Sequence, residues 1–143
     1  MYRIYLDNCC FNRPYDDQSY LSIYLEATAK VHIQHKILQG SIELVWSYMM
    51  DYENHYNPYE DRRNAIANWR HIAKVDIDAS DKIVERGKNL MNFGLKKKDA
   101  LHIACAIEAQ CDYFLTTDKK ILKSNIVEIT TINPLDFIKI LEV

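Results

Sequence analysis

Short apolar segments alternate with longer helical segments along this chain, and this alternation restricts its possible folds more than any other feature. The first such segment, residues 2–6, is a β-branched and aromatic run that ends at the turn-forming pair Asp7 and Asn8. Further strands are predicted at 42–46, 74–77, 113–116 and 126–132. Strands that are separated by helices form parallel sheets with helices on both faces. The sequence therefore predicts a three-layer α/β/α fold with a central, mostly parallel sheet.

The predicted helices lie between these strands, and capping or breaking residues mark their ends. Gly40 and Gly94 end two helices, while Ser47 and Ser80 are suited to helix N-caps. The helix at 97–110 is apolar nearly all round, which is typical of a buried helix. The other helices are predicted at 19–39, 48–56, 58–72, 80–92 and 134–142. In the helix at 19–39 an apolar set falls near one face: Leu21, Tyr24, Leu25, Thr28, Val31 and Ile33.

Length and composition fit one globular domain. A chain of 143 residues buries roughly two-thirds of its unfolded surface, and its 48% hydrophobic content supplies a core. No linker or repeat divides it, so we expect residues 1–143 to form a single domain. No apolar run approaches the roughly 20 residues of a membrane span, and Met1 to Leu6 is too short for a signal peptide. The sequence predicts no membrane segment.

Charge and cysteine content narrow the possible partners and compartment. The formal net charge of -2 gives no general attraction to nucleic acid, so such a partner would need a local basic surface and a bridging metal. No Cys-x-x-Cys pair occurs among the four cysteines, which we expect to be reduced structural residues in a cytoplasmic protein. They are Cys9, Cys10, Cys105 and Cys111.

Four acidic residues are predicted to lie near the end of a parallel sheet where ligands bind. Asp7 and Asp118 follow the first strand and the strand at 113–116, and ligands of open parallel sheets bind outside such strand ends. Asp99 lies in the first turn of the buried helix, where the helix dipole favours a negative charge. Glu53 lies about one and a half turns into the helix after the second strand. We expect these four carboxylates to share one crevice.

Such a cluster needs a cation or protons. Two carboxylates about 4 Å apart repel by roughly 4 kcal/mol at an effective dielectric constant near 20, so the cluster must bind cations or take up protons. Oxygen ligands suit Mg²⁺ or Mn²⁺, which can activate water for attack on a phosphodiester. Each acid also has an ordinary interpretation: strand end, helix cap, first-turn acid or solvated charge.

Four segments of the chain resemble the PIN-domain family. They are Asp7 after the first strand, Ser47 through Glu53, the run Lys98-Asp99-Ala100-Leu101-His102-Ile103-Ala104, and Thr116-Thr117-Asp118. Their order and spacing match the family over essentially the whole chain. The resemblance implies a Mg²⁺- or Mn²⁺-dependent endoribonuclease that cleaves single-stranded or tRNA-like RNA. In bacteria such a domain is often the VapC-type toxin of a toxin–antitoxin pair, with a small antitoxin protein as partner, and it commonly forms a homodimer.

The resemblance also implies roles for individual residues. By motif position, Asp7, Glu53, Asp99 and Asp118 match the four metal-binding catalytic acids. Thr116 matches a hydroxyl residue that orients a ligand or water near the fourth acid.

Two parts of the site depart from the family pattern. Many members follow the first acid with a small hydroxyl residue and then a Ser or Asn, where this chain has Asn8 and Cys9; in addition, Asp51 competes with Glu53 as the second acid. Positions 51 and 53 point to different faces of a helix, so only one of them can contribute, and we favour Glu53.

Three functions are weighed on these residues. The first is the ribonuclease; the second is a non-enzymatic module of the same fold that binds RNA or a protein. The third, a phosphotransfer domain, is disfavoured because Cys9 stands where a dehalogenase-like phosphatase needs an acid.

Three further groups of residues have two interpretations or an ordinary one. The lysines before the buried helix either guide a phosphate backbone or form a solvated helix start: Lys96, Lys97 and Lys98. Tyr48, Tyr52, Tyr56 and Tyr59 either stack unpaired bases or pack in a core or interface. The histidines, including His102, are predicted to be structural.

Overall fold

Five parallel strands form the central sheet of the structure, which is a computed structural model that describes residues 1–142. The order across the sheet is β3-β2-β1-β4-β5. The strand bounds are β1 Tyr2–Leu6, β2 Ile42–Ser47, β3 Val75–Ile77, β4 Tyr113–Leu115 and β5 Thr130–Ile132. From β1 the chain builds outward through β2 to β3, and it then crosses back to place β4 on the other side of β1. The strand order therefore reverses between β1 and β4, where ligands of open α/β sheets bind.

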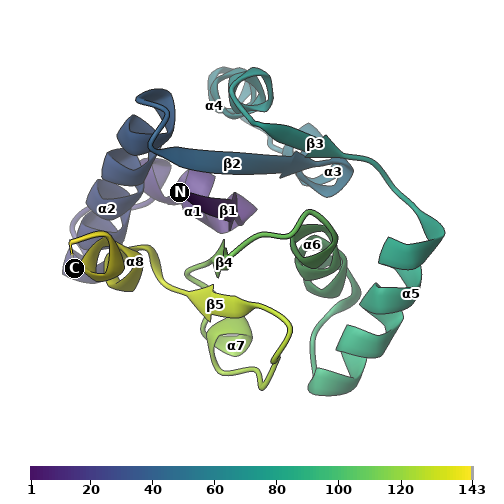
Figure 1. The fold of residues 1–143 in the computed structure, drawn as a ribbon. Helices are drawn as coiled ribbons and strands as arrows, with labels where there is room; N and C mark the ends of the chain where they lie inside the picture. Colours follow the sequence, from purple (N-terminus) through teal and green to yellow (C-terminus); the bar gives the residue numbers. More distant parts are fainter. Residues whose placement is uncertain (143) are drawn as a thin grey trace.

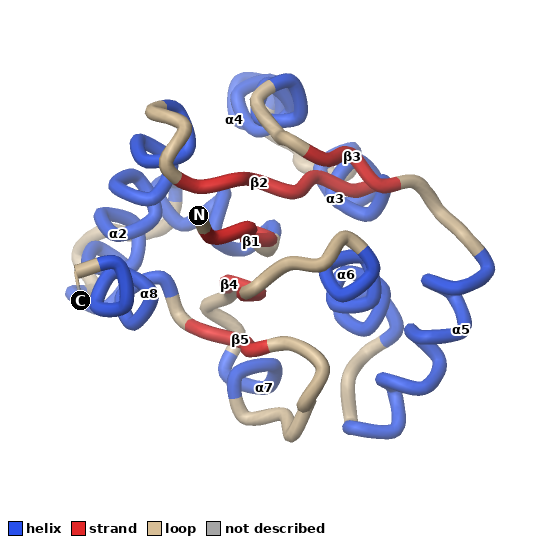
Figure 2. The backbone as a smooth tube through the Cα atoms, viewed as in Figure 1, coloured by secondary structure: helices blue, strands red, loops and turns tan. Residues whose placement is uncertain are grey.

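Helices cover both faces of this sheet, which confirms the predicted three-layer fold. In Figures 1 and 2, α2 and α8 lie on one face, and α6 lies on the other with α5 outside it. The helix bounds are α1 Asn8–Asn12, α2 Leu21–Leu38, α3 Tyr48–His55, α4 Glu60–Ala67, α5 Asp81–Leu90, α6 Lys97–Glu108, α7 Lys119–Leu122 and α8 Pro134–Leu141. None of the helices within residues 1–142 is long and apolar enough to cross a membrane.

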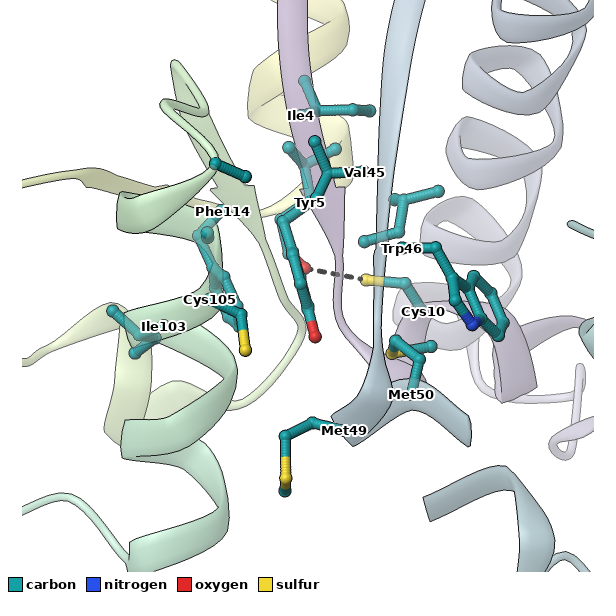
Figure 3. Packing of buried hydrophobic residues seen from close by; sticks show 14 of the residues in the cluster. Ile4, Tyr5, Cys10, Val45, Trp46, Met49, Met50, Ile103, Cys105 and Phe114 are labelled. Carbon is teal, nitrogen blue, oxygen red and sulfur yellow. Dashed lines mark hydrogen bonds between the residues drawn. The ribbon is translucent and has the colours of Figure 1, made fainter. Parts of the chain in front are cut away.

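Aromatic side chains fill the core on both faces of the central strands. On the α6 face, Tyr5 of β1 stacks on Phe114 of β4 with ring centroids 5.2 Å apart. On the opposite face, Trp46 of β2 meets Phe11 of α1 edge-on at 5.7 Å; Figure 3 shows Tyr5 and Trp46 on opposite sides of the strands. Burial of a large apolar side chain contributes about 1.5–3 kcal/mol. These contacts therefore fix the carboxyl ends of β1, β2 and β4.

The predicted helix caps are confirmed. The Ser47 hydroxyl accepts the Met50 N–H at 3.4 Å, and the Ser80 hydroxyl begins α5 in the same way. Gly94 adopts a φ of 84°, a conformation that glycine takes at little cost, and it lies at the end of the segment after α5. At Gly87, α5 packs so closely on α6 that an added Cβ would lie 3.0 Å from a Leu101 methyl carbon.

Three details differ from the predicted elements. The short helix α1 follows β1 directly, although only a turn was expected there. The predicted helix 58–72 divides into α4 and a 3-10 turn at 68–71. The predicted strand 126–132 keeps only Thr130–Ile132, because its neighbour β4 has just three residues with which to pair.

The apolar set near one face of α2 is mostly exposed, although Ile33 is buried in the core. Five of its six members are exposed, and Leu21 is 69% exposed. The buried side instead combines apolar residues with polar ones: Glu26, Ala27, Ala29, Lys30, Ile33, Gln34 and Ile37. Small alanines and buried polar groups, which a hydrophobicity pattern overlooks, form the side that packs on the sheet.

Candidate acidic site

Asp7 lies at the carboxyl end of β1 and is only 7% exposed. One carboxylate oxygen accepts the Asn8 backbone N–H at 2.8 Å, which caps α1, and the other accepts the Thr116 hydroxyl at 2.9 Å. Burial raises the pKa of the Asp7 carboxyl above 3.8, and the charge of Glu53 adds to this effect, although His102 and the hydrogen bonds oppose it. Within residues 1–142, the groups that donate hydrogen bonds to this carboxylate are neutral ones, the Asn8 N–H, the Thr116 hydroxyl and the Cys9 thiol.

The charges of the other acids affect the pKa of Asp99, which lies at the start of α6. Burial raises the pKa of the Asp99 carboxyl, and the charges of Asp7, Asp118 and Glu53 raise it further. Asp118 caps α7 by accepting the Lys120 N–H at 2.9 Å, as its ordinary interpretation predicted. The four acids therefore lie close enough for their charges to interact, and they come from four separate parts of the chain.

Glu53 is the one acid of the four that is held by a basic side chain. Its carboxylate lies 2.6 Å from Nε2 of His102, a fully buried residue of α6. Burial favours the neutral carboxyl, but the hydrogen bond and charge of His102, with the charge of Lys98, outweigh it and lower the pKa of Glu53. Glu53 is thus an ionised carboxylate at neutral pH.

A buried chain of hydrogen bonds leads to Glu53, and we call it the Tyr5–His102 relay. The Tyr5 hydroxyl lies 2.6 Å from the Ser47 hydroxyl and 2.5 Å from Nδ1 of His102. Nε2 of His102 donates to the Glu53 carboxylate, Nδ1 is hydrogen-bonded to the Tyr5 hydroxyl, and the Tyr5 hydroxyl is hydrogen-bonded to the Ser47 hydroxyl. Every polar group of the relay then has a partner, and the carboxylate is fixed in orientation.

Asp51, the alternative second acid, is used elsewhere. Its carboxylate accepts the Trp46 indole N–H at 2.9 Å and lies 3.7 Å from the Arg70 guanidinium. The charge of Glu53, in contrast, raises the pKa of Asp99. The geometry therefore favours Glu53 over Asp51.

The two residues that depart from the family pattern both border the cluster. The Cys9 thiol lies 3.5 Å from the Asp7 carboxylate and 3.5 Å from the Thr116 hydroxyl. The Asn8 side chain helps to lower the pKa of Glu53, and within residues 1–142 its buried amide oxygen has no hydrogen-bond partner. All four cysteines are free thiols.

The donor atoms fit a hard divalent cation, although they do not form a closed cage. The carboxylates and the Asn8 amide oxygen are all oxygen ligands, which Mg²⁺ and Mn²⁺ prefer. Within residues 1–142, no three His, Cys, Asp or Glu side chains are placed closely enough to hold one ion together. Mg²⁺ usually keeps several waters and binds through only one or two carboxylates. The site thus fits a hydrated ion better than a fully protein-bound one.

Sequence reasoning missed the residues that support the carboxylates. His102 was predicted to be structural, yet its position three residues after Asp99 placed it on the same side of the helix. Tyr5 looked like any aromatic residue in a strand. Its hydroxyl meets the Ser47 hydroxyl because β1 and β2 pair in parallel, and it meets His102 because α6 packs on these strands, neither of which a local pattern reveals.

The strand order, the parallel sheet and the helical layers define a three-layer α/β fold. No family model matches this chain, and neither does any curated protein. Among solved structures, the chain is similar to the crystal structure of VapBC2 from Rickettsia felis bound to a DNA fragment from their promoter. The TM-score is 0.57 at 14% sequence identity, and the match covers 92% of this chain and 98% of the other. A likeness at this identity shows the fold.

Proposed function

We propose that this protein is a divalent-metal-dependent endoribonuclease that cleaves RNA phosphodiester bonds at its four-acid cluster. The observation that carries the proposal is the placement of the acids at the topological switch point, where burial and neighbouring carboxylates raise the pKa of Asp7 and of Asp99. Carboxylates are costly to bring together without a cation. The likeness of the fold to a VapBC2 complex supports the same function.

Asp7, Glu53, Asp99 and Asp118 would hold Mg²⁺ or Mn²⁺. When bound, such an ion neutralises phosphate charge and supplies a Lewis acid for hydrolysis. Thr116 orients Asp7 through its 2.9 Å hydrogen bond. The Tyr5–His102 relay orients Glu53 and keeps it ionised at neutral pH. The protein residues therefore fix the ligand oxygens before the RNA arrives, which lowers the cost of ordering them.

The test is cleavage of an end-labelled, mixed single-stranded RNA pool with Mn²⁺, with Mg²⁺ and with EDTA. We expect cleavage that requires metal and that is lost in Asp99→Asn. Glu53→Gln and Asp51→Asn form a matched pair on α3, and we expect only the first to reduce cleavage because the Asp51 carboxylate is bonded to Trp46. Titration calorimetry with Mn²⁺ measures metal binding separately. Protein that neither binds metal nor cleaves RNA would sink the proposal.

A second candidate function is an RNA- or protein-binding module that does not cleave. It is favoured by the placement of the acids, since within residues 1–142 no three of them converge at metal-binding distance and Glu53 is tied to His102. For this function, RNA binding would be the same in wild type and Asp99→Asn, and added metal would produce no fragments.

A protein partner is part of the proposal. The exposed apolar side chains of α2, among them Leu21 and Val31, are suited to a protein interface. We propose a homodimer and, if the chain is a toxin, a small antitoxin encoded beside it. Light scattering after size-exclusion chromatography tests the dimer, and Val31→Lys should shift it toward monomer. A monomeric wild-type protein would refute the homodimer.

A further inference from the structure

A groove lies directly beside the acid cluster, between α3 and α6. Its volume is about 340 Å³, near the lower end of the range for small-molecule sites. We call it the α3–α6 groove, and six residues line it: Tyr48, Met49, Tyr52, Lys97, Lys98 and Leu101. Two of these residues are the sequence neighbours of acids, because Tyr52 precedes Glu53 and Lys98 precedes Asp99.

The groove combines an apolar floor with an aromatic wall and a basic rim. Met49 is only 4% exposed and, with the partly buried Leu101, it belongs to the apolar floor. The Tyr52 ring is 46% exposed, and it meets the Tyr56 ring edge-on at a centroid distance of 5.3 Å. Lys98 Nζ lies 5.5 Å from the Tyr52 ring centroid. A ligand here would meet flat apolar surface and positive charge together.

The positive charge at the rim of the groove also acts on the proposed catalytic site. The positive charge of Lys98 helps to lower the pKa of the Glu53 carboxyl, so Lys98 acts on both places. The protein as a whole carries a net charge of -2, and a polyanion approaching the acids would be repelled without local compensation. Lys97 and Lys98 supply that compensation at one edge of the acid cluster.

We propose that the α3–α6 groove binds an unpaired nucleotide of single-stranded RNA, next to the phosphate at the acid cluster. The base lies over the apolar floor against Tyr52, and the backbone phosphate faces Lys97 and Lys98. This inference rests on the proposed function and names its substrate more closely: a base stacked in a duplex does not offer its face to a side chain. An extended acidic helix of a protein is disfavoured by the small volume of the groove.

The binding test omits cleavage altogether. A labelled eight-nucleotide RNA would be titrated with the protein in EDTA at low salt, and anisotropy would give the dissociation constant. Base stacking on an aromatic residue supports an expected loss of affinity of about tenfold in Tyr52→Ala. The matched control is Tyr2→Ala, which removes a tyrosine of similar exposure, 37% against 46%, at the amino end of β1, the end of the strand away from Asp7. We expect that control to bind like wild type.

Two further ligands separate stacking from charge. An abasic oligomer of equal length keeps the phosphates, and we expect it to bind about tenfold more weakly than the RNA but equally to wild type and Tyr52→Ala. The same RNA closed into a duplex should also bind more weakly. Lys97→Ala should reduce the slope of log affinity against log salt by about one, while Lys139→Ala on α8 should not.

Three results would overturn the groove proposal. They are equal affinity of wild type and Tyr52→Ala for the RNA, equal affinity of wild type for the abasic oligomer and the RNA, and preferential binding of an acidic helical peptide. Each leaves the nuclease proposal standing if metal-dependent cleavage persists. Conversely, Tyr52-dependent binding without any cleavage would support the groove and reject the nuclease.

Discussion

Two carboxylates of this protein are buried to the same degree yet differ in their surroundings. Asp7 at the end of β1 is 7% exposed, and Glu26 on α2 is 8% exposed. Glu26 lies 3.1 Å from the Arg13 guanidinium and accepts the Asn133 amide N–H at 2.6 Å. Among residues 1–142, Asp7 receives hydrogen bonds only from neutral groups, and the charge of Glu53 adds to the effect of burial on its pKa. Burial alone therefore does not distinguish the two.

The difference lies in what compensates each charge. A buried carboxylate that is paired with arginine and an amide is a structural element, because removal of either partner leaves an uncompensated group. A buried carboxylate that faces other carboxylates remains costly until a cation arrives. Asp7 thus has the environment expected of a ligand, whereas Glu26 ties α2 to the segments before α2 and before α8.

The largest effect is expected from Asp7→Asn, which keeps the shape of the side chain and removes its charge. We expect cleavage to fall by about 10²- to 10³-fold, the loss typical of removing one group that stabilises developing charge. Folding stability should increase at neutral pH, because burial disfavours the ionised carboxyl. Initial rates of RNA cleavage and urea denaturation measure the two quantities.

The effect of Asp7→Asn on folding stability should depend on pH. The pKa of Asp7 is raised in the folded state above 3.8, so the folded protein holds the proton more tightly than the unfolded chain does. The stability from this group is complete below pH 3.8 and is lost as the pH rises through the folded-state pKa. The stability gain of Asp7→Asn over wild type should therefore grow from acid toward neutral pH. A gain that is the same in acid and at neutral pH would contradict this account of Asp7.

Glu26→Ala should show the opposite pattern. Its removal leaves the Arg13 and Asn133 side chains without their shared partner, and we expect a loss of about 2–3 kcal/mol in the free energy of unfolding. Cleavage by the remaining folded protein should be unchanged. The control is Glu128→Ala at an exposed position, which should alter neither quantity. A folded Glu26→Ala protein that had lost cleavage would break the comparison with Asp7.

Lys30 tests whether any uncompensated buried charge indicates a site. It is 6% exposed on α2, and its ammonium lies 5.4 Å from the Phe11 ring centroid. Burial lowers the pKa of Lys30 from 10.5 to about 8. The folded state therefore binds its proton less tightly, at a cost of about 3 kcal/mol that is present below pH 8 and is relieved as the pH rises toward 10.5.

We expect Lys30→Met to stabilise the protein by about 2 kcal/mol at pH 7, since the lost cation–π contact offsets part of the gain. The gain should shrink near pH 10, and cleavage should be unaffected at both pH values. Denaturation and cleavage assays at the two pH values check this. Loss of cleavage in Lys30→Met would mean that a single unpaired charge, rather than a cluster of like charges, marks function here.

The sequence predicted the fold because the local patterns and the final structure agree. The strand at 2–6 and the caps at Ser47 and Ser80 are defined by neighbours in the chain, and each is present. The four acids could also be proposed, since a parallel sheet places its strand ends together. The buried face of α2 could not be predicted, because Glu26 lies in it and is held there by partners at positions 13 and 133.

The residues that orient Glu53 could not be predicted either, because they too are distant in the sequence. Contacts between Tyr5, Ser47 and His102 join residues that are 42 to 97 positions apart, and no periodicity in one segment reports them. His102 on a buried helix resembles a core histidine until the carboxylate at its Nε2 is known. Local sequence therefore indicates the ligands, while the residues that orient them emerge only from the packing of strands against α6.

Tyr5→Phe should have the smallest effect and tests how Glu53 is held. The substitution keeps the stacking on Phe114 and removes only the hydroxyl between Ser47 and His102. We expect a loss of about 1 kcal/mol in stability and about a tenfold fall in cleavage, the effect typical of a residue that orients a metal ligand. The Mn²⁺ concentration for half-maximal cleavage should rise, because Glu53 is less firmly oriented.

The matched control is Tyr113→Phe, which removes a hydroxyl from β4 outside the relay. It should leave both cleavage and its Mn²⁺ dependence unchanged. A purely structural role for Tyr5 would lower stability without moving the Mn²⁺ dependence, so that combination would remove the relay from the site. A shift in the Mn²⁺ dependence would instead show that buried residues of the core take part in the function of the site. The surroundings of the acid cluster and those of Glu26 would then have different roles. The surroundings of the acid cluster would serve to orient ligands, while those of Glu26 serve to hold segments together.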